Sequence, residues 1–132
     1  ERPITCIRKR RTFKTEDNKK GYTVVSSKMY PQGDKEKYWF GYRDKRFEDI
    51  EDCDEQYMIL GCRNKTLSVV RFPREFIEQN LGMLNTSVNS ETGEISHYHI
   101  VIFKNPDGKM TMLLSKPALR EIDISDYVVG EI

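Results

Sequence analysis

A chain of 132 residues, 37% of them apolar, can bury one ordinary hydrophobic core, so we expect residues 1–132 to form a single domain, the N-terminal part of a longer protein. No apolar run approaches the ~18 residues of a membrane-spanning helix, and we expect no membrane partner. The net charge of +1 excludes a uniformly basic chain that would coat polyanions on every side.

The charge is divided unevenly along the chain. Residues 1–47 hold 14 Lys and Arg against 6 Asp and Glu, whereas residues 48–132 hold 8 against 15, so the two parts carry net charges of +8 and −7. A basic part of this strength favours a polyanionic partner such as nucleic acid. The acidic part indicates that such binding uses one face only.

The cysteine pattern points to a reduced compartment. Cys6, Cys53 and Cys62 are odd in number, widely spaced and free of any metal-binding spacing. We therefore expect a cytoplasmic protein without a structural zinc site. No motif in the chain calls for a cofactor.

The first predicted element is a strand over residues 4–8, followed by a basic run. This run contains Arg8, Arg10 and Arg11, and a loop is expected after Phe13. Two interpretations remain open for the run: a solvated edge or disordered arm, or a segment that contacts phosphates.

Two further strands are predicted over residues 22–30 and 38–43, which are rich in aromatic and β-branched residues. Alternation along the second strand places Tyr38, Phe40 and Tyr42 on one face and the single tryptophan, Trp39, on the other. These rings either pack in the core or, beside the neighbouring cations, form a stacking surface for bases.

The middle of the chain predicts a short helix over residues 45–53 and then a hairpin. Its strands are residues 57–62 and 67–72, joined by a polar turn, and Pro73 begins a second short helix over residues 74–81. We expect Ile59 and Val69 to lie in the core of this hairpin, so that a charge at either position would unfold the domain.

The last third of the chain predicts further β structure. A polar loop over residues 85–94 precedes a long strand over residues 95–103, and a hairpin turn leads into a strand over residues 110–114. His97 and His99 lie on the same face of the long strand, as rim or core histidines or as two ligands of a metal that lacks an evident third.

No catalytic motif is present. The chain lacks a phosphate-binding glycine loop, a dinucleotide fingerprint and a nucleophile elbow. A metal-dependent nuclease would need carboxylates and a lysine to converge, and the nearest candidates are Glu91, Glu94, Asp107 and Lys109. We expect a recognition module rather than an enzyme, with a small nuclease as a weaker alternative.

Several local patterns occur in a suggestive order. After the aromatic strand come Tyr57-x-x-Leu60-Gly61-Cys62, the helix entry Arg71-Phe72-Pro73, the loop Leu84-Asn85-Thr86 and the strand His97-Tyr98-His99-Ile100. This layout resembles the N-terminal DNA-recognition modules of bacterial restriction systems, of the pseudobarrel type shared with the plant B-three domains. The resemblance spans about two thirds of the chain, residues 27–112.

The resemblance implies a mostly β (α+β) fold, an open seven-stranded pseudobarrel with two short helices. It also implies a module that binds the major groove of double-stranded DNA without catalysis of its own, attached to a nuclease or a McrB-like nucleotide-dependent motor that cuts. One arm would include Ser26, Ser27, Lys28 and Tyr30 and the other would lie around Arg63, Asn64 and Lys65.

The predicted DNA-binding residues combine these arms with the basic positions: Arg8, Arg10, Arg11, Ser26, Ser27, Lys28, Tyr30, Arg43, Lys45, Arg46, Arg63, Asn64 and Lys65. Two alternatives stay open. One is a protein-interaction module of a larger machine. The other is a reader of a flipped modified base in an aromatic pocket of Trp39, Tyr42 and Tyr98.

Overall fold

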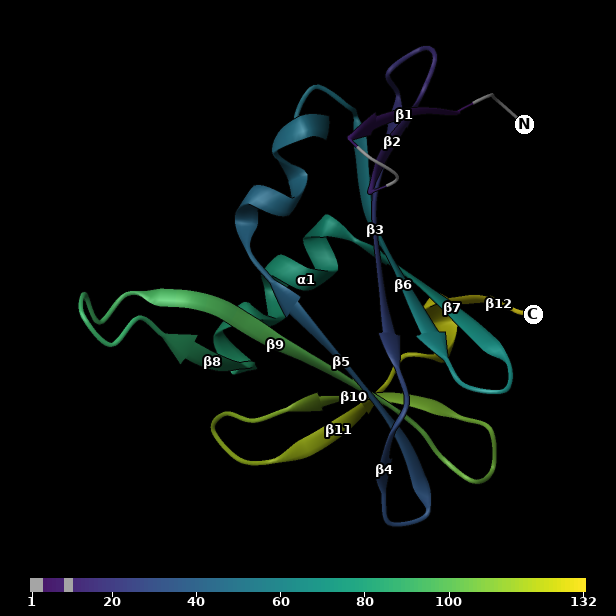
Figure 1. The fold of residues 1–132 in the computed structure, drawn as a ribbon, viewed down its shortest axis with the longest axis vertical. Helices are drawn as coiled ribbons and strands as arrows, with labels where there is room; N and C mark the ends of the chain where they lie inside the picture. The colour runs from purple at the N-terminus through teal and green to yellow at the C-terminus, as the bar shows by residue number, and fades with distance from the viewer. Residues whose placement is uncertain (1–3, 9–10) are drawn as a thin grey trace.

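The computed structural model describes residues 4–8 and 11–132, with side chains from residue 11 onward (Figure 1). The chain is mostly β, as expected, and its strands form two open sheets joined by one hydrophobic core. Figure 1 shows β3 crossing β5 where the two sheets meet.

The first sheet has the order β1-β2-β3-β6-β7-β12. Its strands are β1 (Ile4–Arg8), β2 (Thr12–Thr15), β3 (Lys20–Lys28), β6 (Glu55–Arg63), β7 (Leu67–Pro73) and β12 (Val128–Glu131). All neighbours are antiparallel except β3 and β6, which run parallel over nine paired residues, from Lys20 opposite Glu55 to Lys28 opposite Arg63.

The second sheet has the order β11-β10-β9-β5-β4, with β8 paired to β9 beside it. Its strands are β4 (Tyr30–Gln32), β5 (Lys35–Tyr42), β8 (Asn85–Val88), β9 (Ile95–Lys104), β10 (Met110–Leu114) and β11 (Arg120–Asp123). All of these pairings are antiparallel.

The helical segments are short, and two of them lie where the sequence predicts helices. These are the 3-10 helix η1 (Asp44–Ile50) and α1 (Arg74–Asn80), which begins after Pro73 as expected; η2 (Leu81–Met83) and η3 (Ser125–Tyr127) are single turns. Alpha helix α1 packs Phe76 against Phe72 and Tyr127, with ring centroids 4.7 and 4.4 Å away.

The core lies between the two sheets. Met58, Leu60, Phe72 and Ile102 are fully buried, and Phe47 joins them from η1. Tyr38 and Tyr42 are also buried, and burial raises the pKa of both phenols. The aromatic face of β5 predicted from alternation is therefore the inner face.

The strand count differs from the expected seven, because the described residues form twelve strands. The additional strands have three or four residues, which is too short for alternation to be visible in the sequence. Strand β2 occupies the segment predicted as a loop after Phe13, and the polar β8 lies in the predicted loop over residues 85–94.

The central hairpin buries the face opposite to the one predicted from the sequence. Ile59 and Val69 are half-buried on the outer face of the first sheet, whereas their neighbours Leu60 and Val70 are fully buried. Both faces of β6 carry apolar residues, so its alternation is uninformative. The sequence of β7 is informative, because Arg71 lies two residues after Val69 and so on the same face of the strand. A charged residue there indicates that this face is the outer one.

We predict that Leu60→Asp abolishes folding while Ile59→Asp leaves a folded protein. A charge at the buried position carries a desolvation cost of several kcal/mol, against a total stability of ~5–15 kcal/mol, whereas the outer position remains hydrated. Urea unfolding followed by circular dichroism measures both. Equal unfolding midpoints for the two variants would contradict this assignment of the hairpin faces.

Candidate functional site

Two adjoining hollows of about 440 Å³ each form an open groove between β3 on one side and β5 with η1 on the other. We call it the basic groove, because six cationic residues line it: Arg11, Lys28, Arg43, Lys45, Arg46 and Arg63. The first hollow contains Arg43 and Lys45, the second contains Lys28 and Arg63, and both share Arg11 and Arg46.

The groove exists because β2 is shorter than β3. The pairing of β2 with β3 ends at Thr12 opposite Thr23, and a final bond joins the Val24 amide to the Arg11 carbonyl at 2.7 Å. Beyond that point the described residues provide no strand to cover this edge of β3, and residues 24–28 line the second hollow.

The side chain of Ser27 on β3 is hydrogen-bonded to β5, which forms the opposite wall of the groove. The Ser27 hydroxyl accepts a hydrogen bond from the Trp39 amide at 3.1 Å and donates to the Lys28 carbonyl at 2.8 Å. Ser27 is itself buried. This predicted DNA contact therefore serves to hold β5 against the end of β3.

Trp39 stands at the boundary of the two hollows and is 37% exposed. Its ring meets the stacked imidazoles of His97 and His99 edge to face, with centroids 5.8 and 5.4 Å away. Gly41 leaves room for it, because a Cβ there would lie 3.2 Å from the indole Cη2. The two histidines share one face, as predicted, and support the tryptophan.

Arg46 is the most enclosed of the six cations. Its guanidinium donates to the Gly41 carbonyl at 3.0 Å, which fixes its position in the groove wall. Burial lowers the pKa of Arg46, and the positive charges of Arg11 and Arg43 lower it further. These three side chains therefore form one positive region.

Carboxylates pair with cations elsewhere. In the part of the chain that the structure describes, the ion pairs involve Lys14, Lys35, Arg74 and Lys104, none of which lines the groove. Two acidic residues, Glu48 and Asp49 on η1, do line the first hollow. The groove is thus cationic but has one acidic border.

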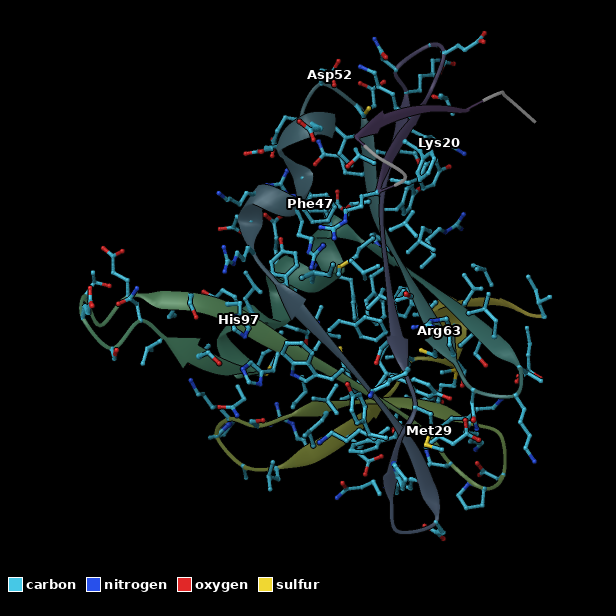
Figure 2. All side chains as sticks on the ribbon, in the orientation of Figure 1. Lys20, Met29, Phe47, Asp52, Arg63 and His97 are labelled. Atoms are coloured by element: carbon cyan, nitrogen blue, oxygen red, sulfur yellow. The ribbon has the colours of Figure 1, made fainter. Side chains whose placement is uncertain are left out.

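The two expected arms lie side by side rather than facing each other. Lys28 is directly opposite Arg63 in the parallel ladder, and the Lys28 ammonium lies 5.3 Å from the ring centroid of Tyr30. Figure 2 shows Arg63 at the end of β6 and His97 on β9, on either side of β5 in this view.

The remaining predicted residues are placed as follows. Ser26 is exposed and lines the second hollow, whereas Asn64 and Lys65 are exposed in the β6–β7 turn outside both hollows. Arg8 ends β1, Arg10 lies outside the described residues, and neither side chain is described.

Three alternative sites do not form. Tyr42 is fully buried on the opposite face of β5 from Trp39, so these residues and Tyr98 make no aromatic cage. The nuclease candidates lie in the turns at the two ends of β9, about 30 Å apart for a ten-residue strand. Among the described residues, no three His, Cys, Asp or Glu side chains gather as metal ligands.

Sequence reasoning missed several lining residues. Thr12 and Thr23 line the first hollow, and they face each other across β2 and β3. Gly41 was also missed, although its position two residues after Trp39 on the same face of the strand is a readable signal.

No family model, curated protein or solved structure matched the chain. Within the described ranges, no helix is long and apolar enough to cross a membrane.

We predict that His99 titrates below the ordinary histidine pKa of ~6.5. Burial disfavours its charged form, and a charge on the stacked His97 ring, 5.2 Å away, disfavours it further. Because the folded state then binds the proton more weakly than the unfolded chain, His99 lowers the stability as the pH falls through ~6.5. An NMR titration of the imidazole resonances measures the midpoint.

The matched variant is His97→Gln, which removes the neighbouring charge and should raise the His99 midpoint. An unchanged midpoint in this variant would show that the two rings are not electrostatically coupled.

Proposed function

We propose that the chain is a double-stranded DNA-recognition module that binds the duplex in the basic groove and has no catalysis of its own. One observation carries the proposal. Cations from β3, η1, β6, the β5–η1 junction and the residue before β2 converge on one open groove, while the described ion pairs lie elsewhere. Cations that are not neutralised by carboxylates are available for phosphates.

The groove also offers the other groups that DNA contacts use. An exposed hydroxyl group comes from Ser26, and the aromatic rings of Tyr30 and Trp39 lie beside the cations. Phosphate contacts from the exposed Arg43 and Lys45 would position the duplex. Lys28 and Arg63, at the far end of the parallel ladder, would reach base edges in the major groove.

We further propose that the two open sheets are a variant of the pseudobarrel, and that the module serves a bacterial restriction system in which an attached nuclease or motor subunit cuts. The support for this part is the order of local patterns around residues 57–62, 71–73 and 97–100, which in the structure form β6, the β7–α1 junction and β9.

A second function is favoured by a separate surface. On the outer face of the first sheet, the Tyr22 and Tyr57 rings stack at 5.6 Å, and the Arg71 guanidinium lies 5.0 Å from the Tyr57 ring centroid. Ile59 and Val69 are half-buried beside them. A sheet face this apolar suits a protein-interaction module of a larger machine.

Duplex binding should depend steeply on salt. Each phosphate contact releases counterions, so log affinity should fall with log salt at a slope of about −0.9 per contact. Arg43→Ala or Lys45→Ala should weaken blunt duplexes of every sequence alike and reduce the slope by about one contact. Lys28→Ala or Arg63→Ala should instead lose ~1–3 kcal/mol selectively on the preferred site.

Fluorescence anisotropy with labelled duplexes from ~50 to ~200 mM salt measures these effects. Lys109→Ala is the matched control, because Lys109 is an exposed cation in the β9–β10 turn outside the groove. This variant should bind each duplex with the affinity of the wild type. Absence of duplex binding at ~50 mM salt, where electrostatic attraction is strong, would place the protein-interaction function first.

A further inference from the structure

We infer that the first hollow of the basic groove binds one unpaired nucleotide at a phosphorylated strand end, with the base against Trp39 and the terminal phosphate on Arg11, Arg43 and Arg46. This inference rests on the proposed DNA-binding function and specifies which part of the DNA the hollow takes.

The size of the hollow sets the first limit. A volume of about 440 Å³ lies in the lower part of the ~300–1,000 Å³ range of small-ligand pockets. A single nucleotide fits a hollow of that size, whereas the stacked base pairs of a duplex bound in the groove have to lie across its opening. The hollow is therefore suited to a nucleotide that has left the duplex or was never paired.

Trp39 supplies a platform for the base. Its contacts with His97 and His99 are edge to face. Trp39 lines both hollows and more than a third of it is exposed, so part of the indole ring borders the groove. Base stacking on such a ring contributes ~1–3 kcal/mol per base and does not require a particular base.

The base has to be unpaired to use this platform. Inside a duplex both faces of a base are covered by its neighbours, so only a flipped or terminal base presents a free π-face. Ser27 binds the backbone amide of Trp39, and Arg46 of η1 binds the carbonyl of Gly41, two residues further along the same strand. Base and phosphate sites thus have a fixed spacing.

The arginine cluster favours a terminal phosphate over an internal one. Arg11, Arg43 and Arg46 line the hollow together, and the positive charges of Arg11 and Arg43 add to burial in lowering the pKa of Arg46. A phosphate monoester carries a charge of about −1.5 to −2 at pH 7, whereas a diester carries about half of that. The doubly charged end offsets more of this positive charge.

The position of the phosphate follows from the hydrogen bonding of Arg46. Arg46 uses one of its five N–H donors for the Gly41 carbonyl, which leaves the others for phosphate oxygens. The phosphate is therefore expected beside Arg46 and Arg11, with the base across Trp39.

Three versions of one duplex test the inference: a blunt duplex, and the same duplex with a single-nucleotide 5′ overhang that ends in a phosphate or in a hydroxyl. The phosphorylated overhang should quench the emission of Trp39, the only tryptophan in the chain. Anisotropy should show it binding about tenfold more tightly than the hydroxyl form, about what one charge-assisted hydrogen bond supplies.

Variants locate the effect. Arg43→Ala, at an exposed position, should remove the advantage of the 5′ phosphate, and Trp39→Leu should remove the advantage of the overhang. Arg63→Ala lies outside the first hollow and should weaken all three duplexes by the same factor. Circular dichroism confirms that each variant is folded.

Equal affinity for the three duplexes would overturn the inference and leave DNA binding in place. A phosphate advantage that persists in both Arg43→Ala and Arg46→Lys would also overturn it, by placing the phosphate outside this hollow. Binding of no duplex at all would overturn the proposed function, and the inference with it.

Discussion

The parallel ladder between β3 and β6 is the constraint on which the rest of the structure depends. Nine residue pairs join Lys20–Lys28 to Glu55–Arg63. Parallel neighbours cannot be linked by a tight turn, so the intervening chain has to leave the sheet and return to its starting end. It does so as β4, β5 and η1, and β5 pairs with β9 to build the second sheet.

Two contacts hold the connecting segment of β4, β5 and η1 against β3. At one end Ser27 binds the Trp39 amide. At the other end η1 packs closely on Gly21, where a Cβ would lie 2.6 Å from the Ile50 Cβ. Because both contacts are tight, the wall that carries Trp39 and Arg46 keeps a defined distance from the edge of β3, and the basic groove is what remains between them.

The long elements of this fold could be predicted from sequence. The hairpin of β6 and β7 and strand β9 have alternating or β-branched runs of seven to ten residues, and Pro73 marks the start of α1. The short polar strands could not be predicted, since β8 has the sequence Asn-Thr-Ser-Val and owes its conformation to pairing with β9. The parallel pairing was also invisible, because it joins segments 35 residues apart without a local signal.

The site could be predicted in part. Most of the basic and hydroxyl positions named from the sequence do gather in the groove, because they lie near the crossing of β3 and β5. What sequence could not supply was the role of each residue. Ser27 connects β3 to β5 by a hydrogen bond, and Tyr42 faces the core. The two arms inferred from the resemblance are the neighbouring ends of β3 and β6.

The most direct test of the central claim is an NMR map of amide shifts on titration with a short DNA duplex. If the basic groove is the binding surface, the largest shifts should occur in residues 24–28 and 39–46 and at Arg63, with little change in β10 and β11. Shifts centred instead on Tyr22, Tyr57 and Ile59, or the absence of shifts at low salt, would contradict the claim.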